Sequence, residues 1–240
     1  ESGWEGSPAE TPAQLIRIPL PIVGEVDTRI KAMIGQLLVG WQDSDQRPVL
    51  ILEFAGSEGE SAGTSQFERS LSLARYVAGD QLNRVRTVAY LSGPVEGHAV
   101  LPVLACEEIV TQADAQLGRA GAGEAFIDAT VQRGYEEIAQ RRRTLPVPVV
   151  LAMLQSGSGL FQVQTQDGTR FVQKEELDDL KKNAVVRSVE QIVPDGEMAS
   201  FSGSDLRLRL GFASHLVRDR VDLASALQLP VDVDPADLWS

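Results

Sequence analysis

The sequence predicts an α/β fold with a mainly parallel sheet. Short continuous apolar runs at residues 48–54 and 85–91 are typical of strands that are buried in a parallel sheet. Before and between them, in residues 27–41 and 67–77, apolar side chains recur at helical spacing. Strands that alternate with helices at this spacing form βαβ units with right-handed crossovers, so we expect the fold to be built from such units.

The first third of the chain supplies two strands and two helices. Residues 1–14 are rich in Gly, Ser, Pro, Thr and Glu, and we expect a flexible tail there, ahead of a domain at residues 15–229. A first strand is expected from residue 15 and ends at Gly24. Asp27 or Thr28 can cap a helix that reaches Trp41. The strand at 48–54 then leads through a Gly/Ser/Glu loop at 56–63 into the helix at 67–77.

The same cycle repeats in the middle of the chain. A strand at 85–91, a turn at 92–97, an apolar helix at 98–107 and a short strand at 108–111 are expected in that order. A loop of small residues at 113–123 precedes a long helix at 123–143. The basic end of this helix, residues 141–143, is expected to be a solvated terminus that the helix dipole favours.

The last third contains an added hairpin. Residues 147–154 are apolar and fit either a helix or a strand, whereas residues 161–165 and 169–172 alternate around an Asp-Gly turn and predict a β-hairpin. A charged, exposed helix is expected at 174–182, so that an insertion occupies about residues 155–190. Short helices are expected at 204–210 and 221–227, and residues 230–240 are expected to be a linker towards a further domain.

Composition limits the classes of function. The 240 residues carry 34 acidic and 22 basic side chains, a net charge of −12, which argues against nucleic acid or an anionic membrane as a partner. The single cysteine, Cys106, excludes an intramolecular disulfide, and two histidines cannot form a three-histidine metal centre. We therefore expect no metal and no cofactor.

No run approaches 18 apolar residues without a charge, so no transmembrane span is expected within this sequence. The sequence starts at Glu1 without a methionine. We expect it to be a piece of a longer protein whose signal or anchor lies elsewhere.

Three short runs carry a resemblance to a known superfamily. They are ACEEIV at residues 105–110, DAQLG at 114–118 and LGFA at 210–213. In this order they resemble the core of the Clp-protease/crotonase superfamily and, within it, signal peptide peptidase A and the NfeD-type membrane serine proteases. The resemblance covers about residues 15–229 and implies a ClpP/crotonase-like spiral of βαβ units with the hairpin as an insertion.

The catalytic residues that the resemblance implies are missing. In such proteases a serine at the start of the small-residue helix is activated by a lysine near the start of the long helix. The matching positions here are Gly97 and Ala125, and no lysine occurs between Lys31 and Lys174. The turn that would help to form an oxyanion hole carries Glu58 and Glu60, whose negative charge opposes that role.

Other reactive side chains have structural explanations. Ser92 at a strand end is expected to cap the next helix, and Cys106 to be a buried, inert thiol. His98 is the better candidate for a site residue, although a satisfied histidine at a helix start with no partner acid is favoured. The adjacent Glu107 and Glu108 point to opposite faces of a strand, and His215 is expected at the surface.

The sequence therefore predicts a degenerate, non-catalytic serine-protease-like domain of a membrane-associated protein, on the extracytoplasmic side. In relatives an extended peptide binds by strand addition in a groove, which implies a peptide or protein segment as partner. Relatives also assemble through the long helix, which implies a homo-oligomer or contact with further domains of the same polypeptide. The groove would be shaped by glycines and one histidine: Gly56, Gly93, Gly97, His98 and Gly121.

Two alternatives stay open. The first is an active serine peptidase with a displaced nucleophile such as Ser92 or Ser57, which needs a Lys or His nitrogen within about 3 Å. The second is acyl-CoA binding of the crotonase kind, for which Arg119 is the obvious cation for the nucleotide phosphates. Its acid/base carboxylates would come from turns that carry Glu58, Glu60, Glu96 and Glu124.

Overall fold

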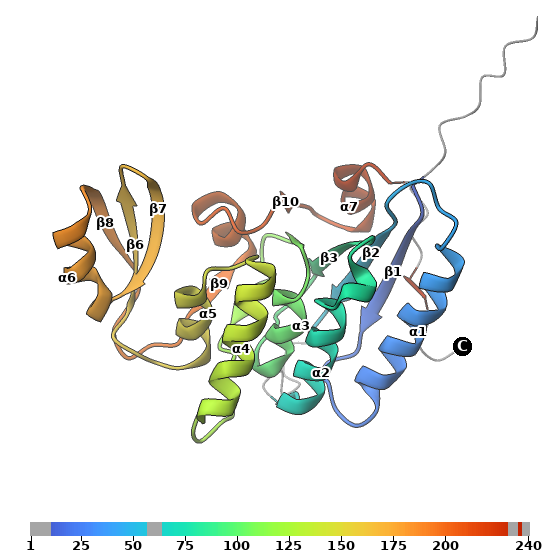
Figure 1. Cartoon of the computed structure of the whole chain (residues 1–240), viewed down its shortest axis with the longest axis horizontal. Coiled ribbons are helices and arrows are strands. Elements are labelled where there is room, and N and C mark those ends of the chain that lie inside the picture. The colour runs from blue at the N-terminus through green and yellow to red at the C-terminus, as the bar shows by residue number, and fades with distance from the viewer. Residues whose placement is uncertain (1–10, 57–63, 230–234, 237–240) are drawn as a thin grey trace, which may run out of the picture.

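The computed structural model describes residues 11–56, 64–229 and 235–236. Its centre is a six-stranded sheet with the order β10-β4-β3-β2-β1-β11, in which every neighbouring pair is parallel (Figure 1). The strands are β1 (Ala13–Ile18), β2 (Val49–Phe54), β3 (Arg86–Leu91), β4 (Glu108–Thr111), β10 (His215–Leu216) and β11 (Pro235–Ala236).

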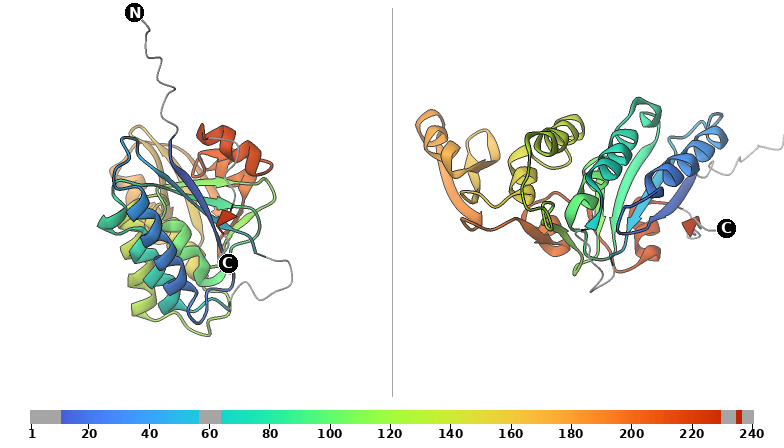
Figure 2. Two further views of the ribbon diagram at one scale, coloured as in Figure 1. Left: turned by 90° about the vertical axis from the view of Figure 1, so that its right-hand side faces the viewer. Right: turned by 90° about the horizontal axis from the view of Figure 1, so that it is seen from below.

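Helices cover both faces of this sheet. One face packs against α1 (Val26–Gly40), α2 (Phe67–Val77) and α3 (Val100–Leu104), and α4 (Ala129–Arg142) and α5 (Val147–Leu154) continue this layer. The opposite face packs against α7 (Arg220–Leu227), which Figure 2 shows on the other side of the strands. Alternate residues of β1 follow this division, because Ile16 contacts the first layer and Leu15 the second.

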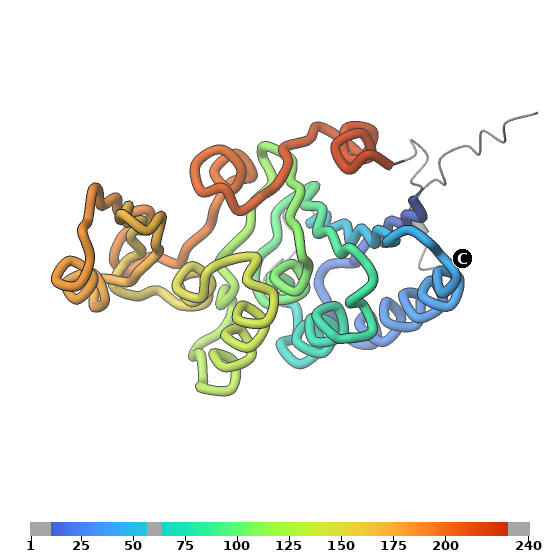
Figure 3. The backbone as a smooth tube through the Cα atoms, turned by 45° about the horizontal axis from the view of Figure 1, so that its top comes forward, coloured from blue at the N-terminus to red at the C-terminus, as the bar shows by residue number. Residues whose placement is uncertain are grey.

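Two small antiparallel sheets complete the fold. Strand β5 (Gln116–Gly118) pairs with β9 (Ser200–Ser202) beside the central sheet. Strands β6 (Leu160–Thr165), β7 (Gly168–Gln173) and β8 (Val186–Val193) form a sheet of order β7-β6-β8, against which α6 (Lys174–Asn183) packs. Figure 3 shows this part, the β6–β8 lobe (residues 160–193), at one end of the molecule.

The structure confirms the predicted α/β class, the central strands and the hairpin. The chain from 147 to 154 is a helix, and the charged helix at 174–182 is α6. Two short helical turns are η2 (Asp80–Leu82), between α2 and β3, and η4 (Asp205–Arg209), between β9 and β10. The second lies within the expected helix at 204–210. In the part of the chain that the structure covers, no helix is both long and apolar enough to cross a membrane.

Several expected boundaries were wrong. Strand β1 begins at Ala13, inside the expected tail, and the long helix begins at Ala129, because the Asp128 side chain accepts hydrogen bonds from Thr130 and Val131 and so caps it there. The apolar helix after the turn is split into η3 (Gly97–Ala99) and the short α3. Within the expected linker, Pro235–Ala236 form a strand that pairs with β1.

Candidate functional site

The position expected for a nucleophile lies in the turn after β3, at the carboxyl end of the central strands. Gly97 starts η3 and has a φ of 62°, a left-handed conformation that residues with a Cβ rarely adopt. Its backbone N–H donates to the carbonyl of Arg119 at 3.1 Å. Val95 in the same turn exchanges hydrogen bonds with Gln116 and Gly118, so the β5 segment occupies the side of this turn.

His98 follows Gly97 and is buried, with 1% of its surface exposed. Its Nδ1 lies 3.0 Å from the Tyr135 hydroxyl, and its Nε2 lies 3.1 Å from Oε1 of Glu124. The ring also meets Phe67 edge-on, with 5.2 Å between ring centroids. The expectation of a histidine without a partner acid is therefore wrong, because the segment before α4 brings Glu124 to the ring.

Burial lowers the pKa of His98, and the neighbouring Glu124 opposes this shift only in part. Burial also raises the pKa of Tyr135 well above its ordinary value, so its hydroxyl keeps its proton. A neutral His98 with its proton on Nε2 donates to Glu124 and accepts from Tyr135. Both ring nitrogens are then engaged within the protein.

The position expected for a lysine lies next to this cluster. Ala125 is exposed and directly follows Glu124, in the irregular segment 119–128 between β5 and α4. The contact between Glu124 and His98 brings together the neighbours of the two candidate positions, Gly97 and Ala125. That these two positions are a degenerate nucleophile and a degenerate lysine stays a prediction. The sequence argument missed the Glu124 carboxylate and the Tyr135 phenol that contact His98.

The remaining candidate glycines lie at close backbone contacts. A Cβ on Gly56 would lie 2.1 Å from the Pro94 carbonyl oxygen, and one on Gly93 would lie 2.8 Å from that of Gly56. A Cβ on Gly121 would lie 2.0 Å from the carbonyl oxygen of Leu154. Gly56 and Gly93 let the two turns that contain them approach each other closely, and Gly121 lets the 119–128 segment approach the end of α5. Their role in a peptide groove stays a prediction.

The Ser92 hydroxyl was expected to cap the next helix, and this expectation is wrong. It lies 3.3 Å from Oε1 of Glu53 and 3.4 Å from the Phe54 carbonyl, while Glu96 precedes η3 without a side-chain cap. Glu53 itself accepts from Arg220 at 2.7 Å. No Lys or His nitrogen among the described residues is hydrogen-bonded to Ser92, and Ser57, Glu58 and Glu60 lie outside that part of the chain.

One serine does contact a lysine in the described residues. The Lys31 ammonium, on α1, donates to the Ser72 hydroxyl on α2 and to Asp27 at 3.0 Å. Burial would raise the pKa of Asp27, but Lys31, Ser72 and Arg69 together lower it. The ammonium is thus paired with an ionised carboxylate and acts as a donor, whereas a general base needs a free amine.

The other reactive groups are structural. Cys106 is buried, its thiol donates to the Pro102 carbonyl, and burial raises its pKa to about 12. Glu107 binds Arg47 and Arg142, whereas Glu108 binds Arg86, so the adjacent carboxylates serve different contacts, as the sequence predicted.

Three further expectations concern charged side chains. His215 lies at the surface, as predicted, with 41% of its side chain exposed. Arg119, the cation expected for acyl-CoA, lies 4.0 Å from Glu96. The expectation of a solvated end for residues 141–143 is wrong for Arg142, which donates to the backbone carbonyls of Ala105 and Val77. Within the described ranges no group of three or more His, Cys, Asp or Glu side chains could hold a metal ion.

Comparisons with known proteins identify the fold. No family model matches the chain, and no curated protein matches it. Among solved structures, a serine-to-alanine mutant of the 1510-N membrane-bound stomatin-specific protease has a TM-score of 0.53 and 7% identity over 96% of this chain and 93% of that chain. A lysine-to-alanine mutant of the same protease, in complex with a substrate peptide, has a TM-score of 0.53 and 8% identity over 96% and 88% of the two chains.

A second kind of protein also occurs among the structural neighbours. A member of the enoyl-CoA hydratase/isomerase family has a TM-score of 0.50 and 16% identity, over 90% of this chain and 70% of that chain. At such low identities the likeness is one of fold. The chain has the Clp-protease/crotonase fold that the short sequence runs predicted.

Proposed function

We propose that this chain is a non-catalytic Clp-protease/crotonase-like domain that binds a peptide or protein segment. The observation that carries the proposal is the composition of the site after β3. Gly97, at the position that the resemblance implies for the nucleophile, is a glycine in a left-handed conformation, and the neighbouring His98 has both ring nitrogens engaged by Tyr135 and Glu124.

The chemistry of acyl transfer needs a nucleophile and a group that takes its proton. Gly97 has no hydroxyl, and a lysine is absent from residues 32–173 of the sequence. The buried His98 cannot accept a further proton from a substrate or a serine without breaking its contact with Tyr135. These features support a role other than covalent catalysis.

The surface beside this site favours binding. Phe126 is 79% exposed and lies two residues after Glu124, in the segment that contacts His98. Exposed aromatic side chains are typical anchors of protein and peptide partners. The fold is compatible with this use, because one structural neighbour is described in complex with a substrate peptide. The proposal places the partner against the 119–128 segment.

The proposal includes the setting of the protein. We infer assembly into a homo-oligomer, or contact with further domains of the same polypeptide, in a membrane-associated protein on the extracytoplasmic side. The name of one structural neighbour, a membrane-bound protease, supports the membrane part of this setting.

Labelling with a fluorophosphonate serine-hydrolase probe tests the absence of catalysis. We expect no covalent labelling of the purified chain, with an active serine hydrolase as the positive control for the probe. Labelling that disappears in Ser57→Ala, Ser61→Ala or Ser92→Ala would establish a displaced nucleophile instead. Binding of acetyl-CoA that is lost in Arg119→Gln would favour the crotonase alternative.

A peptide array tests the binding role. We expect the parent chain to bind a subset of peptides and the Phe126→Ser variant to lose most of them. Val39→Ser is the matched control, because Val39 is also an exposed apolar residue but lies on α1. An array on which the parent binds nothing, or binds as well after Phe126→Ser, would contradict the proposed partner site.

A further inference from the structure

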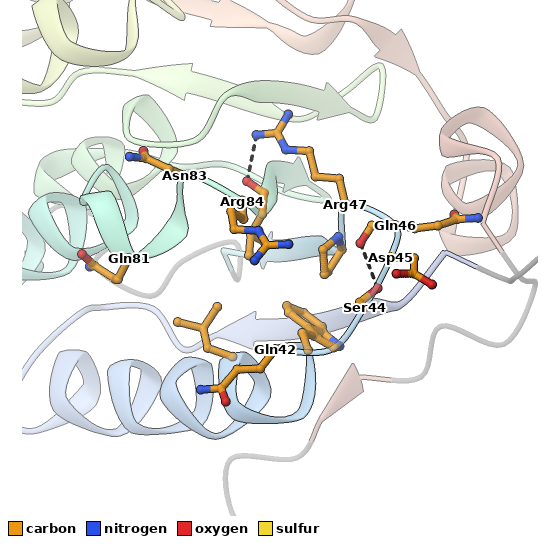
Figure 4. Close-up of a pocket in the computed structure, with 12 residues that line it drawn as sticks. Gln42, Ser44, Asp45, Gln46, Arg47, Gln81, Asn83 and Arg84 are labelled. Carbon is orange, nitrogen blue, oxygen red and sulfur yellow. Dashed lines mark hydrogen bonds between the residues drawn. The ribbon is translucent and has the colours of Figure 1, made fainter.

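A hollow of about 590 Å³ lies at the amino ends of β2 and β3, opposite the end of the sheet that carries Gly97. Its walls are the last turn of α1, the loop from α1 to β2, and residues from η2 to the start of β3 (Figure 4). Its volume lies within the usual range of small-molecule sites, about 300–1,000 Å³. The hollow shares no residue with the candidate site, so the inference below is independent of the proposed function.

One part of the lining is apolar. Leu38 and Trp41, from the end of α1, and Pro48 and Val85, which precede the two strands, all contribute to it. Pro48 and Val85 are buried, whereas Trp41 is half-buried and packs in part against the main core. An indole and a proline that line the same hollow are suited to a flat aromatic ligand.

The second part of the lining is cationic. The Arg47 guanidinium is held by a bidentate contact with Glu107, at 2.6 and 2.8 Å, and by a hydrogen bond to the Val85 carbonyl at 3.0 Å. Its charge is therefore already matched. Arg84 is exposed and forms no ion pair with a carboxylate in the residues that the structure covers. Figure 4 shows its side chain between Asn83 and Arg47.

Neutral and acidic groups complete the lining. The side-chain amides of Gln42 and Asn83 are exposed and can donate hydrogen bonds to a ligand. Asp45 is the carboxylate among the lining residues, and its charge opposes an anion. An anionic group would therefore be expected at Arg84, with its ring system towards Trp41.

We propose that this hollow binds a small aromatic anion, a flat ring system that carries a carboxylate or a phosphate monoester. The ring would lie against the apolar wall that includes Trp41 and Pro48, and the anionic group would pair with Arg84. A guanidinium suits either anionic group, because its N–H donors match both geometries. The proposal concerns binding and involves no chemical step.

The test uses 2-naphthoate and 2-naphthyl phosphate as probes and 2-naphthol as their neutral analogue, with binding to the whole chain followed by ligand-observed NMR titration. We expect at least one acid to bind more tightly than 2-naphthol. Arg84→Gln should weaken that acid about fivefold to tenfold through loss of a charge-assisted hydrogen bond. Asp45→Asn should tighten it by about twofold through loss of repulsion.

Arg187→Gln is the matched control, because Arg187 is an exposed arginine on β8, in the lobe remote from this hollow. It should leave the affinity of the acid unchanged. Whichever acid binds better identifies the anionic group. The proposal is overturned if neither acid binds at millimolar concentration, if Arg84→Gln binds like the parent, or if Arg187→Gln weakens binding as much as Arg84→Gln does.

Discussion

His98 couples the site after β3 to pH. Burial lowers its pKa below the ordinary value of 6.5, while Glu124 raises it in part. Between the folded pKa and 6.5 the unfolded chain therefore binds a proton that the folded chain does not. The contribution of this group to stability is complete above 6.5 and falls as the pH decreases towards the folded pKa.

The first prediction follows from this sign. Replacing His98 by glutamine keeps hydrogen-bonding groups near Glu124 and Tyr135 but removes the titration. We expect the free energy of unfolding to fall less between about pH 7.5 and about pH 5.5 in His98→Gln than in the parent, measured by urea denaturation at each pH. His215→Gln, at a histidine outside this cluster, is the control for the loss of an imidazole elsewhere in the chain. Equal pH dependence in His98→Gln and the parent would contradict the assignment.

For individual residues, the sequence revealed the missing serine and lysine more easily than the contacts of the site. The glycine at position 97 and the absence of lysine from residues 32–173 can be read directly from the sequence. The partners of His98 are not, because Glu124 and Tyr135 follow it by 26 and 37 residues and come from a different segment. Only the packing of α4 beside α2 and α3 brings Tyr135 to the ring.

At the scale of elements, Arg142 joins the end of α4 to its neighbours. Its Nε donates to the carbonyl of Ala105, after α3, at 3.0 Å, and its Nη2 to that of Val77, the last residue of α2, at 2.7 Å. A third contact reaches Glu107 at 3.4 Å. With 12% of its side chain exposed, this arginine supplies donors to helix-end carbonyls that water reaches poorly.

The second prediction concerns this junction. Arg142→Met keeps most of the apolar packing of the stem and removes the donors. We expect a loss of about 2–4 kcal/mol in the free energy of unfolding, because two backbone carbonyls lose their donor, whereas Glu107 keeps its contact with Arg47. Urea denaturation measures the loss. The adjacent Arg141, paired with the highly exposed Asp80, gives the control, and Arg141→Met should cost less than about 1 kcal/mol. Equal effects of the two changes would show that Arg142 acts only as surface charge.

Elements with a strong apolar pattern were predictable, and so was the charged helix α6, whereas β8 and the shortest strands were not. Strands β2 and β3 are almost wholly buried and stand out as apolar runs. Strand β8 is largely exposed, and β5, β9 and β10 have only two or three residues, so their existence depends on distant pairing partners. The start of α4 moved to Ala129 because the cap at Asp128 outweighs the apolar spacing that begins earlier.

At the scale of the whole molecule, the β6–β8 lobe has a small core of its own. Val163, Val172 and Leu177 form a cluster separate from the main core. The two chain segments that enter and leave the lobe lie together, because Leu160 pairs with Val193 and the N–H of Gly196 donates to the Gly157 carbonyl at 2.8 Å.

The lobe also touches the body of the molecule. Phe171 packs on Phe212 with 5.0 Å between ring centroids, and the Arg209 guanidinium lies 2.5 Å from Glu190. Leu160 and Val193 belong to the main core, unlike the tip of the lobe. The boundary between the two cores therefore lies just beyond this pair of residues, which the sequence alone placed only as an insertion at about 155–190.

The third prediction follows from this boundary. Deleting residues 161–192 and joining Leu160 to Val193 through an Asn-Gly turn replaces the lobe by a two-residue hairpin connection, because these two residues already lie opposite each other in antiparallel strands. We expect the shortened chain to fold cooperatively, with a thermal midpoint lowered by about 3–10 °C through loss of the cover on Phe212. Circular dichroism melting and the dispersion of amide NMR signals measure this outcome. Adding Phe212→Ser should recover solubility if the uncovered ring causes association. A shortened chain that fails to unfold cooperatively, with or without that change, would show that the lobe is an integral part of the central fold.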